Sequence, residues 1–123
     1  MKAKKEAMKK FNKMTIPDMK KVLKLMGAKA DNAMDEAVEN ALYDKIEKDA
    51  SAVLNVINVP DFELRCSIED MLSLNILRRQ GSKYLYVDDV IGYDVEETIT
   101  YLKDPKNQEI LRVLKEKVAT IKE

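Results

Sequence analysis

A row of apolar residues at helical spacing dominates the middle of the chain and predicts a largely helical fold. No glycine or proline interrupts this row before Pro60. It predicts one helix from Asn32 to Asn58, about 40 Å long and capped by Asp31. Its other face is acidic along its first half, with Asp35, Glu36, Glu39, Asp44, Glu47 and Asp49. The apolar row consists of Met34, Val38, Leu42, Ile46, Ala50, Val53, Leu54 and Ile57.

Shorter helices are predicted on both sides. Thr15 and Asp18 form a capping pair before a helix over about residues 16–26, and Gly27 follows it. Asp94 and Glu97 begin another helix, and Asp104 with Pro105 begins the last one. With only three glycines and three prolines in 123 residues, the fold class is predicted to be mainly α.

The segment 61–92 mixes helical and strand patterns. We expect a helix over about 68–80, whereas 61–66 fits either a strand or an extra helical turn. Residues 83–92 have the composition of a minimal β element. A helix followed by such strands resembles the layout of winged-helix domains in 67–92. In that layout Arg78, Arg79 and Lys83 would lie near a DNA backbone.

The charges sum to zero but are sorted along the chain. Residues 1–29 carry ten lysines and two acids, a net charge of +8. Residues 30–76 carry three basic residues and eleven acids, a net charge of −8, and residues 77–123 are balanced. Helices exposed to solvent usually mix their charges, so this sorting indicates a binding role.

Several kinds of chemistry are missing from the sequence. It contains no histidine, a single cysteine (Cys66) and no glycine-rich phosphate loop. The acids at 88–97 are explained by helix capping, so we expect no metal site. We therefore predict a protein that is not an enzyme and has no cofactor. Without a disulfide pair or a long apolar run, we expect it to be cytoplasmic, in a reducing compartment, and not in a membrane.

Function is predicted from the basic front end. We expect residues 1–14 to be a basic arm, frayed when alone, and residues 15–123 to be a single helical domain. The leading hypothesis is a nucleic-acid-associated accessory factor of transcription, packaging or replication type, such as small viral or phage proteins. The alternative is an assembly adaptor that self-associates or binds an acidic protein surface. Either partner would contact Lys4, Lys5, Lys9, Lys10, Lys13, Lys20, Lys21, Arg78, Arg79 and Lys83.

Overall fold

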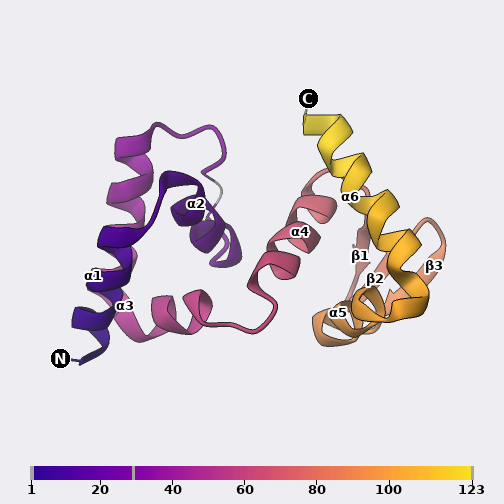
Figure 1. Ribbon diagram of the computed structural model, residues 1–123, viewed down its shortest axis with the longest axis horizontal. Helices are drawn as coiled ribbons and strands as arrows, with labels where there is room; N and C mark the ends of the chain where they lie inside the picture. The colour runs from indigo at the N-terminus through magenta and orange to yellow at the C-terminus, as the bar shows by residue number, and fades with distance from the viewer. Residues whose placement is uncertain (1, 29, 123) are drawn as a thin grey trace. The chain divides into compact units, whose positions relative to one another are not determined.

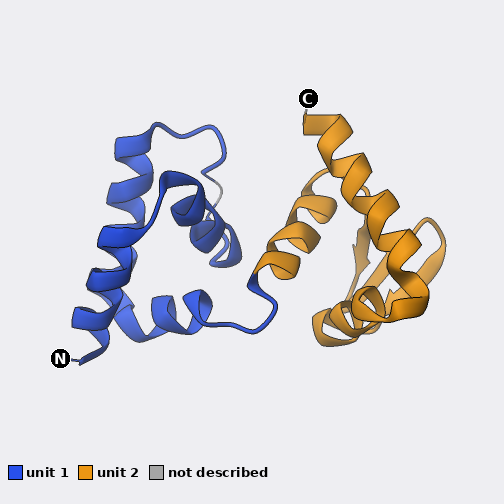
Figure 2. Cartoon of the chain, in the orientation of Figure 1, with its two compact units in different colours: residues 1–62 blue, residues 63–123 orange. Residues whose placement is uncertain are grey.

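The computed structural model describes residues 2–28 and 30–122, which form two compact units, residues 1–62 and 63–123 (Figure 2). The predicted fold class is confirmed in its main terms. Within the described residues there are six α-helices, one short 3₁₀ helix and one three-stranded antiparallel sheet.

Unit 1 consists of three helices, α1 (Lys2–Lys13), α2 (Ile16–Leu25) and α3 (Asp35–Ile57) (Figure 1). Both α1 and α2 pack against α3. This arrangement differs from the predicted division into an arm and one domain, because α1 contributes to the core of unit 1. The buried core residues are Ala7, Met19, Val22, Leu23, Val38, Leu42, Ile46 and Val53.

The predicted start of α2 is confirmed. The Thr15 side chain accepts a hydrogen bond from the Asp18 backbone N–H at 3.3 Å, and Pro17 lies in the first turn. Gly27 follows the helix with φ of +84°, a backbone conformation that glycine adopts without a steric penalty.

The prediction of one continuous helix from Asn32 to Asn58, capped by Asp31, is wrong in two respects. The helix α3 begins at Asp35, with Met34 in the N-cap position. It is also kinked at Asp49, whose φ of −158° and ψ of 83° are not helical. The Asp49 carboxylate accepts a hydrogen bond from the Ala52 N–H at 3.1 Å, so Asp49 caps the second part of α3.

Unit 2 begins with α4 (Phe62–Ser73), most of which belongs to it, and continues with β1 (Arg78–Gln80), β2 (Lys83–Tyr86) and β3 (Asp89–Gly92). The strands form an antiparallel sheet in the order β1-β2-β3. The helices α5 (Val95–Lys103) and α6 (Gln108–Lys122) follow, joined by the 3₁₀ helix η1 (Pro105–Asn107) (Figure 1). The buried core residues are Ile68, Met71, Leu77, Tyr84, Ile91, Ile99, Leu102 and Leu114.

The predicted helix over 68–80 is wrong at both ends. It begins at Phe62, which settles the open segment 61–66 as helix, and it ends at Ser73. The chain then turns at Asn75, whose φ is +61°, and residues 78–80 form β1. The predicted β element is confirmed as β2 and β3. However, a third strand separates it from the helix, so Arg78 and Arg79 are not at a helix end as in the winged-helix layout.

The start of α5 packs tightly on the end of β3. The Asp94 side chain caps α5 by accepting a hydrogen bond from the Glu97 N–H at 2.8 Å, as predicted. A Cβ atom at Gly92 would lie 2.2 Å from Thr98 Oγ1 and 2.5 Å from the Thr98 N atom. Only glycine therefore fits at the point where the sheet meets α5.

Candidate nucleic-acid interface

The basic segment of unit 1 is an amphipathic helix. In α1, Ala7 is fully buried, and Met8 and Phe11 pack against the core of unit 1. An isolated helix of this length is only marginally stable in water, so contact with α3 supplies most of the stabilisation of α1. This contact also determines which side of α1 faces solvent.

Four lysines form a stripe on the exposed side of α1, and we call them the lysine stripe: Lys2, Lys5, Lys9 and Lys13. Their spacing of three or four residues places them on one face of the helix. All four are exposed, and within residues 2–28 and 30–122 none of them makes an ion pair. The stripe extends over about 16 Å, at 1.5 Å per residue.

Lys4 lies on the other side of α1 and binds α3. Its Nζ atom donates a hydrogen bond to Glu47 Oε2 at 2.8 Å. The hydrogen bond from Lys4, together with one from Tyr43, lowers the pKa of Glu47, and the same bond raises the pKa of Lys4. The ring of Phe11 lies 6.3 Å from that of Tyr43, centroid to centroid. Lys4 therefore joins α1 to the acidic helix and does not belong to the stripe.

The remaining predicted lysines of unit 1 are less available than the stripe. Lys10, Lys20 and Lys21 are half-buried. The Lys20 Nζ donates a hydrogen bond to the backbone oxygen of Asp31 at 3.0 Å. Its neighbour Lys24 lies 3.8 Å from the Asp31 carboxylate. These contacts with Asp31 neutralise part of the positive charge of α2 within the chain.

The predicted residues of unit 2 lie on the first hairpin of the sheet. Arg78 is exposed and donates a hydrogen bond to the backbone oxygen of Val87 at 2.7 Å. The Arg79 guanidinium lies 5.7 Å from the centre of the Tyr84 ring. Lys83 is exposed and lies 5.8 Å from the centre of the Tyr93 ring. These aromatic contacts orient two of the three cations.

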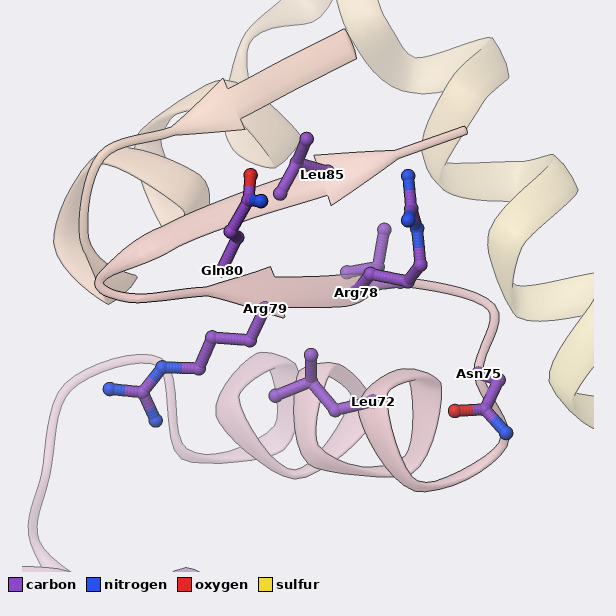
Figure 3. Close-up of a pocket in the computed structure, with 7 residues that line it drawn as sticks. Leu72, Asn75, Arg78, Arg79, Gln80 and Leu85 are labelled. Carbon is purple, nitrogen blue, oxygen red and sulfur yellow. The ribbon is translucent and has the colours of Figure 1, made fainter. Parts of the chain in front are cut away.

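A groove of about 480 Å³ lies against β1 and is lined by residues of α4, of the turn that follows it, of β1 and of β2. Leu72 points from α4 toward β1, and the side chains of Arg78 and Arg79 leave β1 on opposite sides (Figure 3). The described residues that line the groove include no carboxylate: Leu72, Asn75, Leu77, Arg78, Arg79, Gln80 and Leu85. Both predicted arginines thus belong to a groove with an apolar wall.

The other lining residues could not be predicted from the sequence. Leu72 and Asn75 have the spacing of a helix, and Leu85 lies in the expected β element, whose neighbours the sequence does not reveal. The signal that could have revealed the groove is Gly81-Ser82, a two-residue turn that also requires a strand before it.

The structure contributes two findings on other classes of site. Among the described residues, no group of acidic or cysteine side chains is arranged to hold a metal ion. In the same part of the chain, no helix is both long and apolar enough to cross a lipid bilayer. Comparison with protein-family models, with curated proteins and with solved structures gave no match.

Proposed function

We propose that the protein associates with nucleic acid, without catalysing a reaction, through the lysine stripe on α1. The observation that carries the proposal is the exposure of Lys2, Lys5, Lys9 and Lys13 on one face of a helix. The opposite face is buried against α3, so the four ammonium groups point to solvent together. Lysines that neutralise phosphates release bound counterions, which is the main source of affinity in such complexes.

The arrangement favours phosphate contacts over reading of base sequence. The stripe consists of flexible ammonium groups, which act as point charges and lack the paired donors with which arginine recognises guanine. Binding through the stripe is therefore expected to be independent of sequence and sensitive to salt. The folded helix also holds the charges at fixed spacing, so less conformational entropy is lost on binding than with an unfolded arm.

The test compares two variants with equal loss of charge. One replaces three stripe lysines with glutamine (K5Q, K9Q, K13Q), and the control replaces three exposed lysines elsewhere (K48Q, K106Q, K115Q). The affinity for a fluorescent DNA duplex is measured by anisotropy between about 50 and 200 mM salt. We expect the stripe variant to lower the slope of log K against log salt by roughly 2.7 in magnitude, at about 0.9 per phosphate contact.

The control variant distinguishes local charge from total charge. Because the whole chain has no net charge, both variants carry the same net charge of −3, and we expect the control to keep the wild-type slope. Equal losses in the two variants would contradict the proposal. Absence of DNA binding by the wild type, together with a molecular mass that rises with concentration and falls with salt, would favour the assembly adaptor instead.

A further inference from the structure

The groove along β1 has the features of a peptide-binding site. We infer that it binds an extended acidic peptide, which adds a strand to the outer edge of β1. This inference does not depend on the lysine stripe, because all the residues involved belong to unit 2.

The pairing of the strands shows which backbone groups of β1 face the groove. Gln80 pairs with Lys83 across the two-residue turn, Arg79 with Tyr84, and Arg78 with Leu85. Antiparallel pairs alternate between hydrogen-bonded and non-hydrogen-bonded, and the pair next to a two-residue turn is hydrogen-bonded. The Arg79 N–H and C=O therefore point away from β2. Within the described residues no strand covers this edge, since the sheet order is β1-β2-β3.

The side chains around the edge suit a peptide of alternating acidic and apolar residues. Successive residues of an added strand point to opposite faces of the sheet. Arg78 and Arg79 leave β1 on opposite sides (Figure 3). A peptide that alternates acidic and apolar residues therefore presents all its carboxylates to one face of the sheet, and we assign that face to Arg79. Leu85, the cross-strand partner of Arg78, lines the groove and offers an apolar contact on the other face to the residues between. No described lining residue is a carboxylate, but the Asp88 carboxylate lies 3.7 Å from the Arg78 guanidinium. Arg79 is therefore the main cation that the groove offers to an acidic peptide.

The three residues of β1 are all exposed, and two of them carry charges that set which chains the edge can pair with. The Ile76 and Leu77 N–H groups donate to the Met71 carbonyl at the end of α4, at 2.8 and 3.1 Å. These bonds hold the chain beside α4 up to Leu77, so Asn75 and Leu77 line the groove together with β1. Exposed strand edges pair readily with other chains unless they are covered or charged. The charges at this edge are both positive, which repels basic segments and admits acidic ones.

The experiment follows the backbone amides of the full chain by NMR during titration with a capped hexapeptide of alternating glutamate and valine. We expect shift changes in residues 72–85 and slower hydrogen exchange at the Arg79 N–H. A matched peptide of glutamine and valine should bind more weakly because it lacks the carboxylates. Changes centred outside the groove, or equal affinity for both peptides, would overturn the inference.

Two variants at one position separate charge from strand pairing. Arg79→Gln removes only the guanidinium and should weaken binding roughly threefold. Arg79→Pro also removes the outward N–H, and proline is tolerated in edge strands. It should weaken binding about fivefold more than Arg79→Gln does. Arg112→Gln, on α6 and outside the groove, is the control and should bind as the wild type. Equal affinities of the two Arg79 variants would exclude strand addition.

A change in the peptide gives the same information without any risk to the fold. N-methylation of alternate peptide residues should abolish binding in one register and leave it intact in the other, because only one set of N–H groups faces β1. Loss of binding in both registers, or in neither, would contradict the inference. A DNA duplex that shifts the groove amides while the peptide does not would identify the groove as a phosphate site and overturn it.

Discussion

Val87 is the residue whose backbone is most strained by its side chain. It lies in the two-residue turn between β2 and β3 with φ of +58°, a conformation that β-branched residues rarely adopt. Val87 is 64% exposed, so packing of its side chain contributes little free energy to offset the strain. The hydrogen bond from Arg78 goes to the Val87 backbone oxygen and does not depend on the side chain.

Replacing Val87 with glycine is therefore expected to stabilise unit 2. Relief of a left-handed conformation is worth about 1–2 kcal/mol, and the entropy of glycine in the unfolded chain offsets about half of that. We expect V87G to raise the free energy of unfolding by up to about 1 kcal/mol, measured by urea denaturation. Val90→Gly, at an exposed strand position with ordinary φ, should instead lower it. A destabilised V87G would show that the turn tolerates valine without strain.

The helix-capping residues differ in whether their role could be predicted from the sequence. The capping roles of Thr15, Asp94 and Asp104 were predictable, because each pairs a short polar side chain with the start of an apolar helical pattern. The role of Asp49 was not predictable in this way. It lies in a segment whose apolar row continues without a break, so the sequence predicts that Asp49 is one more acid on the exposed face of the helix.

At the scale of elements, helices were predicted better than strands. Each helix buries an apolar stripe of several turns, which is visible in the sequence. The strand β1 has three residues, all polar and all exposed, so it shows no alternation of apolar and polar residues. Its existence depends on pairing with β2, a contact that local patterns do not encode. The groove beside it, and most of its lining, was unpredictable for the same reason.

The attachment of α1 to α3 should depend on pH through Glu47. Its pKa is lowered from the ordinary value of 4.5 by hydrogen bonds from Lys4 and Tyr43. A carboxyl group with a lowered pKa in the folded state stabilises the fold above its ordinary pKa, and this contribution is lost as pH falls through the lowered value. At the basic end, the raised pKa of Lys4 predicts loss of the contribution only as pH rises above 10.5.

Comparison with Glu47→Gln isolates this contribution. At neutral pH we expect the wild type to unfold at higher urea concentration than E47Q, because only the wild type has the charged partner for Lys4. The difference between the two midpoints should disappear as pH falls below 4.5. Glu39→Gln, on the same helix and exposed, is the matched control. A difference between wild type and E47Q that persists in acid would show that Glu47 acts through packing and not through charge.

For the whole molecule, the sorting of charge along the chain has a partly internal explanation. The basic α1 and α2 both pack on α3, which carries most of the acids of unit 1. Residues 1–62 therefore hold twelve basic and ten acidic residues, a net charge of only +2. Part of the predicted attraction between the basic and acidic segments therefore acts between helices of unit 1. What remains for an external partner is the lysine stripe, whose members face solvent.

The two units have separate cores, and this predicts that each one folds alone. The first core draws its buried residues from 7–53 and the second from 68–114. Single domains of about 60 residues bury enough surface to be stable, though marginally so. We expect fragments 1–62 and 63–123 to give NMR amide spectra that together reproduce most peaks of the full chain. A fragment without dispersed amide peaks would show that its unit needs the other to fold.

The same fragments assign the proposed functions to separate units, since the lysine stripe and the β1 groove lie in different ones. Fragment 1–62 should bind DNA with the salt slope of the full chain, because it retains every stripe lysine. Fragment 63–123 should bind the acidic peptide with the affinity of the full chain and should show no stripe-dependent DNA binding. DNA binding that requires both fragments in one chain would mean that phosphates contact Arg78, Arg79 or Lys83 as well as the stripe. In that case the slope for the full chain would exceed that of fragment 1–62 by about 0.9 for each added contact.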